Sequence, residues 1–386
     1  MRDRDDWHWQ LRNRITTLRE LENYIELSPE EKDGIRAASE RFTWSISPYY
    51  AGLMDPEDPD CPIRRQAVPS PEELFDDLGV PDPLEEGKHS PVELIIRVYP
   101  DRVAFCVGNR CAMYCRHCLR KETMVGRQDA NFSDEKIEEG IQWIRETPEI
   151  RDVLLTGGDP LLLSDDRIES IVARIHAIPH VEVVRIGSRT PCTLPQRITE
   201  ELCGRLEKYH PLYLNTQFNH PREITPEAQE ACARLAAAGI PLGNQSVLMK
   251  GVNDSVEVMK ELCRELMRIR VRPYYIYQCQ VLSGTRHLRT PVECGREIIH
   301  KLQGFTSGLA VPKFIVDTPY GKIPLSPRYG LGREGDEFVL RSWNGKIWRE
   351  PNPVRNRKPL GSCEGEEVRE QREPAFCSQC TTCRVS

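Results

Sequence analysis

The sequence has no run of apolar residues long enough to cross a bilayer, which argues against a membrane-spanning protein. It also has no long basic run, and its formal net charge is −6, so no nucleic-acid partner is expected. The first residues, Met1–Trp7, are charged and lack the apolar core of a signal peptide. We therefore expect a cytoplasmic protein without a membrane partner.

Cysteine, in contrast, is plentiful, with 15 in a chain of 386 residues. In a chain without a signal peptide, this favours metal sites and free thiols in a reducing compartment over disulfides. Hydrophobic residues make up 39% of the chain, which is enough for a core. The length fits one large domain or two.

Three cysteines, Cys111, Cys115 and Cys118, lie within eight residues in a C-x3-C-x2-C spacing, directly after the apolar run 102–108. Three thiolates on one loop can bind three irons of a cubane cluster and leave the fourth iron open to a small ligand. Core cysteines are a poor alternative because charged residues surround them. A structural zinc site would need a fourth ligand, for which His117 is the close candidate.

From residue 101 onward, strand-like runs alternate with helical patterns. The expected strands are 102–107, 152–156, 181–186, 212–217, 242–248 and 273–279, and the expected helices lie near 134–147, 165–178, 196–208, 226–239, 255–269 and 292–305. Six β-α units predict a parallel sheet with right-handed crossovers. Six are too few for a closed eightfold barrel, so we expect an open (β/α)6 partial TIM barrel of α/β class, with ligands at the carboxyl ends of its strands.

Four regions are expected along the chain. Residues 1–95 predict an N-terminal wrap with two helices over 7–45, and residues 96–310 the barrel. Residues 311–350 predict a strand followed by a hairpin over 338–348 with an Asn-Gly turn. Residues 351–386 form a polar C-terminal extension.

A second candidate site follows the expected strand 152–156, where the sequence reads Gly157-Gly158-Asp159-Pro160. Two glycines let a backbone approach a ligand closely, and Asp159 can bind an ammonium group. The alternative is an ordinary strand-to-helix turn in which Asp159 is a cap.

These motifs and several longer stretches resemble the lysine 2,3-aminomutase family of the radical S-adenosylmethionine (SAM) superfamily. The matching stretches are Trp7–Gln10, Pro48–Tyr50, Cys61–Gln66, Tyr99–Arg102, the three-cysteine motif, Gly187–Pro191, Asn244–Ser246, Arg270–Cys279 and Arg289–Pro291. The resemblance implies a [4Fe-4S] cluster, SAM, pyridoxal 5′-phosphate (PLP) and a low-potential electron donor. It also implies an isomerase that moves the α-amino group of an amino acid to the β-carbon.

The resemblance further implies roles for individual residues. The cluster would be bound by Cys111, Cys115 and Cys118, and SAM would lie near His117, Gly157, Gly158, Asp159, Gln245 and Tyr277. PLP would be attached to Lys322, with Tyr99 and Arg102 near its phosphate. Arg120 would bind the substrate carboxylate. Two departures from the family pattern stand out. Val98 replaces a basic residue, and only Tyr320-Gly321 remains of the glycine run before Lys322.

The tail carries a second triplet, Cys377, Cys380 and Cys383, with metal-ligand spacing. In the family, tail cysteines bind zinc together with a cysteine of a neighbouring subunit, which implies a homo-oligomer. The matching position here is Ser255, so the fourth ligand is open, with Cys363 and Cys263 as candidates. The triplet could instead hold a second cluster.

For the substrate, the family's lysine enzymes place two aspartates around the distant ammonium. One is Asp317 here, and the other position is Gln280. Because a buried charge needs a partner, this pair favours a cationic or neutral polar side chain. We expect lysine first, arginine or ornithine next, and glutamate last. The alternatives are a lysine isomerase linked to translation-factor modification, which has a shorter tail, and a non-catalytic metal-binding module.

Overall fold

The computed structural model describes residues 5–125, 132–327 and 329–351. The chain divides into two units, residues 1–328 and residues 329–386. In the described ranges, no helix combines the length and the apolar character needed to cross a membrane.

The first unit contains one nine-stranded sheet in which the strands follow one another in chain order. Seven neighbouring strands are parallel: β2 (Arg102–Gly108), β3 (Asp152–Gly157), β4 (Val183–Gly187), β5 (Leu212–Thr216), β6 (Leu242–Leu248), β7 (Val271–Gln278) and β8 (Lys313–Thr318). The short β1 (Ile95–Ile96) and β9 (Gly321–Leu325) pair antiparallel at the two edges. The predicted open barrel is confirmed, and the strand expected after residue 310 continues its sheet as β8.

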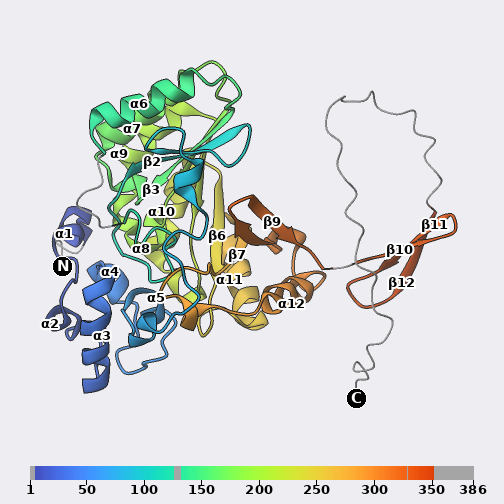
Figure 1. Cartoon of the computed structure of the whole chain (residues 1–386), viewed down its shortest axis with the longest axis horizontal. Helices are drawn as coiled ribbons and strands as arrows, with labels where there is room; N and C mark the ends of the chain where they lie inside the picture. The colour runs from blue at the N-terminus through green and yellow to red at the C-terminus, as the bar shows by residue number, and fades with distance from the viewer. Residues whose placement is uncertain (1–4, 126–131, 328, 352–386) are drawn as a thin grey trace. The chain divides into compact units, whose positions relative to one another are not determined.

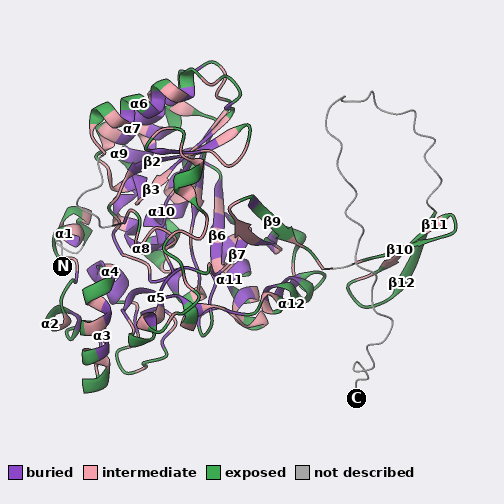
Figure 2. Ribbon diagram, in the orientation of Figure 1, coloured by how far each residue is buried: buried purple, intermediate pink, exposed green. Residues whose placement is uncertain are grey.

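Helices connect the parallel strands, and the longer ones are amphipathic and cover the outer face of the sheet (Figure 1). They are α6 (Asp134–Arg145), α7 (Asp165–His176), α8 (Thr190–Thr193), α9 (Glu200–Leu206), α10 (Pro226–Ala237), α11 (Val256–Arg268) and α12 (Val292–Leu302). Ser133, Ser164 and Thr225 cap α6, α7 and α10, each accepting a backbone N–H. Figure 2 shows the buried strands and inward helix faces, with the outer helix faces exposed.

The N-terminal segment forms five α-helices beside the barrel (Figure 1). They are α1 (Trp7–Arg12), α2 (Leu18–Leu21), α3 (Pro29–Arg41), α4 (Pro48–Ala51) and α5 (Arg64–Ala67). Three helices lie within 7–45, where two were predicted. The first helix, α1, ends at Arg12, and α2 is a separate single turn. A capping box begins α3: Ser28 Oγ accepts from Glu31 N–H, and the Glu31 carboxylate accepts from Ser28 N–H.

In the second unit, the described residues form a three-stranded antiparallel sheet of β10 (Gly330–Glu334), β11 (Glu337–Arg341) and β12 (Ile347–Pro351). The predicted hairpin is confirmed in β11 and β12. Its turn contains Asn344 and Gly345, and Gly345 has a φ of 83°, which favours glycine. The added strand β10 was not expected from the sequence.

Candidate active site

A cavity of about 640 Å³ lies within the first unit, and every strand of the sheet except β5 contributes to its lining, together with neighbouring loops. Its lining follows the two-residue period of the strands, since Asp152, Leu154 and Thr156 of β3 all face it. Among the described residues with a predicted role in cluster, SAM, PLP or substrate binding, only Cys111, Gly158 and Asp159 do not line it. The others do: Tyr99, Arg102, Cys115, His117, Cys118, Arg120, Gly157, Gln245, Tyr277, Gln280, Asp317 and Lys322.

The three-cysteine loop leaves the carboxyl end of β2 and is fastened to the N-terminal wrap. Arg116 is buried and donates from Nε and Nη2 to the Glu73 carboxylate, at 2.8 and 2.6 Å. The backbone N–H of Arg116 also donates to the Gln66 carbonyl. Removing one partner of a buried ion pair costs about 3–5 kcal/mol, so this pair fixes the loop strongly. The wrap therefore determines where the cysteines lie.

Two thiols of this loop, Cys111 and Cys118, lie in surroundings that oppose their deprotonation. Burial raises the pKa of Cys118 to about 11 and raises that of Cys111 well above its ordinary value. Metal ligation requires the thiolate, so a bound cation would have to supply the compensation. Among the described residues, no three His, Cys, Asp or Glu side chains converge on one ion. A cubane cluster does not need such convergence, because each cysteine binds a different iron.

The turn after β3 is built for close backbone approach. Gly157 has a φ of 110°, and a Cβ on Gly158 would lie 2.6 Å from the backbone nitrogen of Arg110. Asp159 is buried, and its carboxylate accepts from Ser188 Oγ at 2.6 Å and from the N–H groups of Arg189 and Thr190. A ligand ammonium would have to compete with these donors. The geometry therefore gives Asp159 the capping role that the sequence left as the alternative, and it positions the loop after β4.

His117 is a buried side chain with one nitrogen engaged. Its Nε2 lies 2.9 Å from the Gln217 amide nitrogen, which makes Nε2 the acceptor and places the proton on Nδ1. Nδ1 is buried and has no hydrogen-bond partner among the described residues. Burial lowers the pKa of His117 well below its ordinary value, so the ring is neutral. A buried donor without a partner beside the cavity fits a site that holds a ligand.

Lys322 lies on β9 directly opposite Asp317 of β8, and its Nζ is 3.4 Å from the Asp317 carboxylate. Only Pro319 and Tyr320 separate the two strands, so the shortened loop still turns Lys322 into the cavity. Gly321 has a φ of 105°, and a Cβ there would lie 2.8 Å from the Tyr99 hydroxyl. That hydroxyl accepts from the Lys322 N–H at 2.7 Å. Burial raises the pKa of Asp317, and Lys322 acts in the opposite direction.

Aromatic and cationic side chains surround this end of the cavity. The Arg102 guanidinium lies 3.7 Å from the centre of the Tyr99 ring, and the Lys322 ammonium lies 5.9 Å from the Tyr99 ring and 5.8 Å from the Tyr277 ring. Val98, which stands where the family pattern has a basic residue, also lines the cavity. Arg185 of β4 also lines the cavity, with its Nε donating to Asp152.

Arg120 is fixed by a residue that the sequence analysis did not identify. Its Nε and Nη2 donate to the two oxygens of Glu86 at 2.9 and 2.7 Å, and its Nη1 donates to Thr156 at 3.2 Å. Glu86 begins the 3₁₀ helix η3 (Glu86–His89). One edge of the guanidinium is thus occupied, while Nη1 and Nη2 each carry a second hydrogen on its other edge.

At the expected side-chain pocket, Gln280 and Asp317 both line the cavity. The Gln280 amide nitrogen lies 3.4 Å from the Asp317 backbone carbonyl, which brings the two positions together.

The tail triplet Cys377, Cys380 and Cys383, and Cys363 with it, lie outside the described residues. Ser255 caps α11, accepting from the Val258 N–H. Cys263 is 1% exposed within the core, so the structure does not support it as a ligand for a shared metal.

Arg189, Tyr50 and Gln66 lie in stretches that match the family but received no role from the sequence. Arg189 contacts Cys115, and Tyr50 and Gln66 contact Arg189, as described below. For Glu86 the sequence gave no signal, since it lies in a polar segment without periodicity.

Comparisons with known proteins agree with this geometry. The sequence model described as "Radical SAM superfamily" matches residues 105–263, and the one described as "Lysine-2,3-aminomutase" matches residues 299–374. L-lysine 2,3-aminomutase of Clostridium subterminale is 51% identical over 94% of this chain and 87% of its own. L-lysine 2,3-aminomutase of Bacillus subtilis (strain 168) is 48% identical over 90% of this chain and 74% of its own. Glutamate 2,3-aminomutase of Clostridioides difficile (strain 630) is 49% identical over 89% of this chain and 82% of its own. Overall identity therefore does not distinguish a lysine substrate from glutamate.

Proposed function

The chain belongs to the lysine 2,3-aminomutase family of radical SAM isomerases, and from this premise we propose that it moves the α-amino group of L-lysine to the β-carbon. One observation carries the proposal. Cys115 and Cys118 of the cluster loop and Lys322 of β9 line the same cavity. Hydrogen abstraction and amine transfer must act on one bound substrate, so both groups have to reach a single site.

The residues around the cysteine loop fit a [4Fe-4S] cluster with SAM. When bound, this pair supplies the radical that removes a hydrogen atom from the substrate. We assign the cluster to Cys111, Cys115 and Cys118 and SAM to His117, the Gly157–Gly158 backbone, Gln245 and Tyr277. The neutral His117 would donate from its unpartnered Nδ1. The enclosing strands would exclude water from the reacting atoms.

The residues at the other end of the cavity fit PLP, which when bound would supply the chemistry that makes amine migration possible. Lys322 would hold it covalently, beside Tyr99 and Tyr277. Arg102 would bind its phosphate. Arg185 is a second cation that lines the cavity, whereas Val98 supplies no charge. Asp317, now beside Lys322, would be freed for the substrate's distant ammonium once the Lys322 amine is engaged.

We propose that Arg120 binds the substrate carboxylate with its free edge while Glu86 orients the guanidinium from the other. The variant Arg120→Met is expected to raise KM for the amino acid by about 10- to 100-fold, because a charge-assisted hydrogen bond is lost. Steady-state kinetics would measure the change.

Because Met at position 120 leaves Glu86 unpaired, the double variant R120M/E86Q is made as well. It should show the same rise in KM. The exposed Arg268, replaced by Met, is the matched control and should leave KM unchanged. An unaltered KM in both Arg120 variants would show that the carboxylate binds elsewhere.

Lysine is favoured over glutamate by the charge of the side-chain pocket. Asp317 would attract a cationic side chain and repel a second carboxylate, while the Gln280 amide is neutral. One carboxylate and one amide make a weaker site for an ammonium than two carboxylates. Arginine and ornithine carry the same charge and rank behind lysine.

The substitution Gln280→Asp tests this assignment. We expect it to lower KM for lysine by about fivefold, since a charged acceptor adds about 1 kcal/mol over a neutral one. The matched control is Gln280→Asn. Its side chain has the same shape as that of Gln280→Asp but carries no charge, so it should not lower KM. Turnover of lysine, arginine, ornithine and glutamate by all three proteins would be compared. Preferential turnover of glutamate by the unmodified protein would overturn the lysine assignment.

We also propose that Cys377, Cys380 and Cys383 bind zinc and help to hold a homo-oligomer, as their spacing suggests. A chain ending at residue 370 should then lose zinc in metal analysis and retain its iron. Replacement of the three cysteines by serine should have the same effect within the full-length chain. If about four irons disappear instead, the triplet binds a second cluster.

A further inference from the structure

The loop that follows β4 places a buried arginine against the cluster cysteines. Arg189 is 8% exposed, and its Nη1 donates to the Cys115 sulfur at 2.8 Å. Its backbone N–H is held by the Asp159 carboxylate at 2.9 Å. Guanidinium remains charged in proteins and has donors only, so the Cys115 sulfur must be the acceptor.

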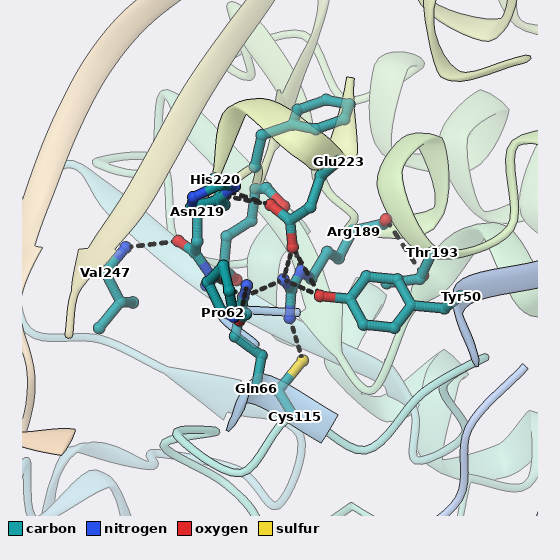
Figure 3. Close-up of polar contacts among 12 residues, drawn as sticks. Tyr50, Pro62, Gln66, Cys115, Arg189, Thr193, Asn219, His220, Glu223 and Val247 are labelled. Carbon is teal, nitrogen blue, oxygen red and sulfur yellow. Dashed lines mark hydrogen bonds and ion pairs between the residues drawn. The ribbon is translucent and has the colours of Figure 1, made fainter. Parts of the chain in front are cut away.

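The other two nitrogens of this guanidinium also have hydrogen-bond partners (Figure 3). Nε donates to the Gln217 carbonyl at 3.1 Å, and Nη2 donates to Gln66 Oε1 at 2.6 Å and to Glu223 Oε1 at 2.8 Å. The side chains of Gln66 and Glu223 are fully buried. With every nitrogen engaged, the group cannot turn away from the sulfur.

Glu223 is the counter-charge of Arg189, and its own oxygens are saturated. Oε1 also accepts from the Tyr50 hydroxyl at 2.6 Å, and Oε2 accepts from the N–H groups of Asn219 and His220. The pair is therefore neutral as a whole, with its positive end directed at the sulfur and its negative end directed away from it.

We propose that Arg189 is a positioning residue that sets the reduction potential of the cluster through Cys115, with Glu223 as the balancing charge. This rests on the proposed function, because it takes Cys115 as an iron ligand. Hydrogen bonds to cluster sulfurs and nearby net charge are the protein's means of setting such potentials. A donor to the sulfur stabilises the reduced cluster, which carries one more negative charge. The electron itself comes from the external low-potential donor.

The proposal predicts shifts of opposite sign from two buried neighbours. Arg189→Gln removes the positive charge and should make reduction harder by about tenfold or more, equivalent to about 59 mV for one electron. Glu223→Gln removes the balancing negative charge and should make reduction easier. A general loosening of the fold would not move the two potentials in opposite directions.

The test is a redox titration of the anaerobically reconstituted full-length protein, followed by electron paramagnetic resonance without substrate. The double variant R189Q/E223Q leaves no uncompensated buried charge and should fall between the two single variants. Arg205→Gln is the matched control, because Arg205 pairs with acidic residues on the outer face of α7 and α9, and it should not shift the potential.

The outcomes separate this inference from the proposed function. If the unmodified protein takes up no cluster, both are wrong. If it does, and the Arg189 and Glu223 variants titrate at the unmodified potential, only this inference is wrong. If Arg189→Gln does not assemble a cluster, the Glu223→Gln variant alone tests the proposal. A higher reduction potential in that variant supports the proposal, and an unchanged potential overturns it.

Discussion

Replacement of Cys111, Cys115 or Cys118 by Ala is expected to abolish SAM cleavage. The loop has three thiols for three irons, so the loss of one leaves a cubane without a protein ligand on a second iron. The fourth iron must stay open for SAM, and no spare thiol of the loop can take over. Iron analysis and anaerobic formation of 5′-deoxyadenosine would measure the effect.

Cys232→Ala is the matched control, since Cys232 is buried on α10 away from the motif. It should retain iron and cleavage. Retained SAM cleavage in all three motif variants would remove the assignment of the cluster to this loop.

Replacement of Lys322 by Arg should reduce aminomutase turnover by a factor on the order of 10³ or more, as expected for loss of a covalent catalytic group. Arginine keeps the charge beside Asp317 but cannot form the covalent link to PLP. Borohydride reduction of the unmodified protein, followed by peptide mapping, should find the pyridoxyl group on Lys322.

Lys313→Arg, an exposed change at the start of β8, is the control and should leave labelling and turnover intact. Pyridoxyl found on a different lysine would show that the shortened loop has moved the function from Lys322.

The fold could be predicted where local patterns decide it. The strand 242–248 alternates buried and half-buried residues along its length, and the helix starts carry side-chain caps, so both were found from the sequence. The length of α2 could not be predicted, because the apolar spacing of Leu18, Leu21 and Ile25 continues beyond the turn where the helix ends. Leu21 and Ile25 are buried in the core and Leu18 packs against it, but only tertiary contacts determine the backbone there.

The site could be predicted where a motif or a family resemblance names the residue, as for the cysteines and Lys322. Interactions between distant parts of the chain were not predictable. Glu86 meets Arg120 across 34 residues, and Arg189 meets Cys115 across 74. Such pairs depend on which loops the barrel brings to the same end, and neither spacing nor composition reports that. For Asp159 the sequence allowed two roles, and only the four protein donors around its carboxylate distinguish them.

The central claim, intramolecular transfer of an α-amino group to the β-carbon, has a direct test. The reconstituted protein, with PLP, SAM and a low-potential reductant, is incubated without oxygen with L-lysine carrying ¹³C at C2 and C3 and ¹⁵N at the α-amino group. Nuclear magnetic resonance then follows the ¹³C–¹⁵N coupling. The account predicts that the coupling at C2 disappears and one at C3 takes its place. Coupling that stays at C2 while SAM is cleaved, or an unlabelled amine at C3, would contradict it.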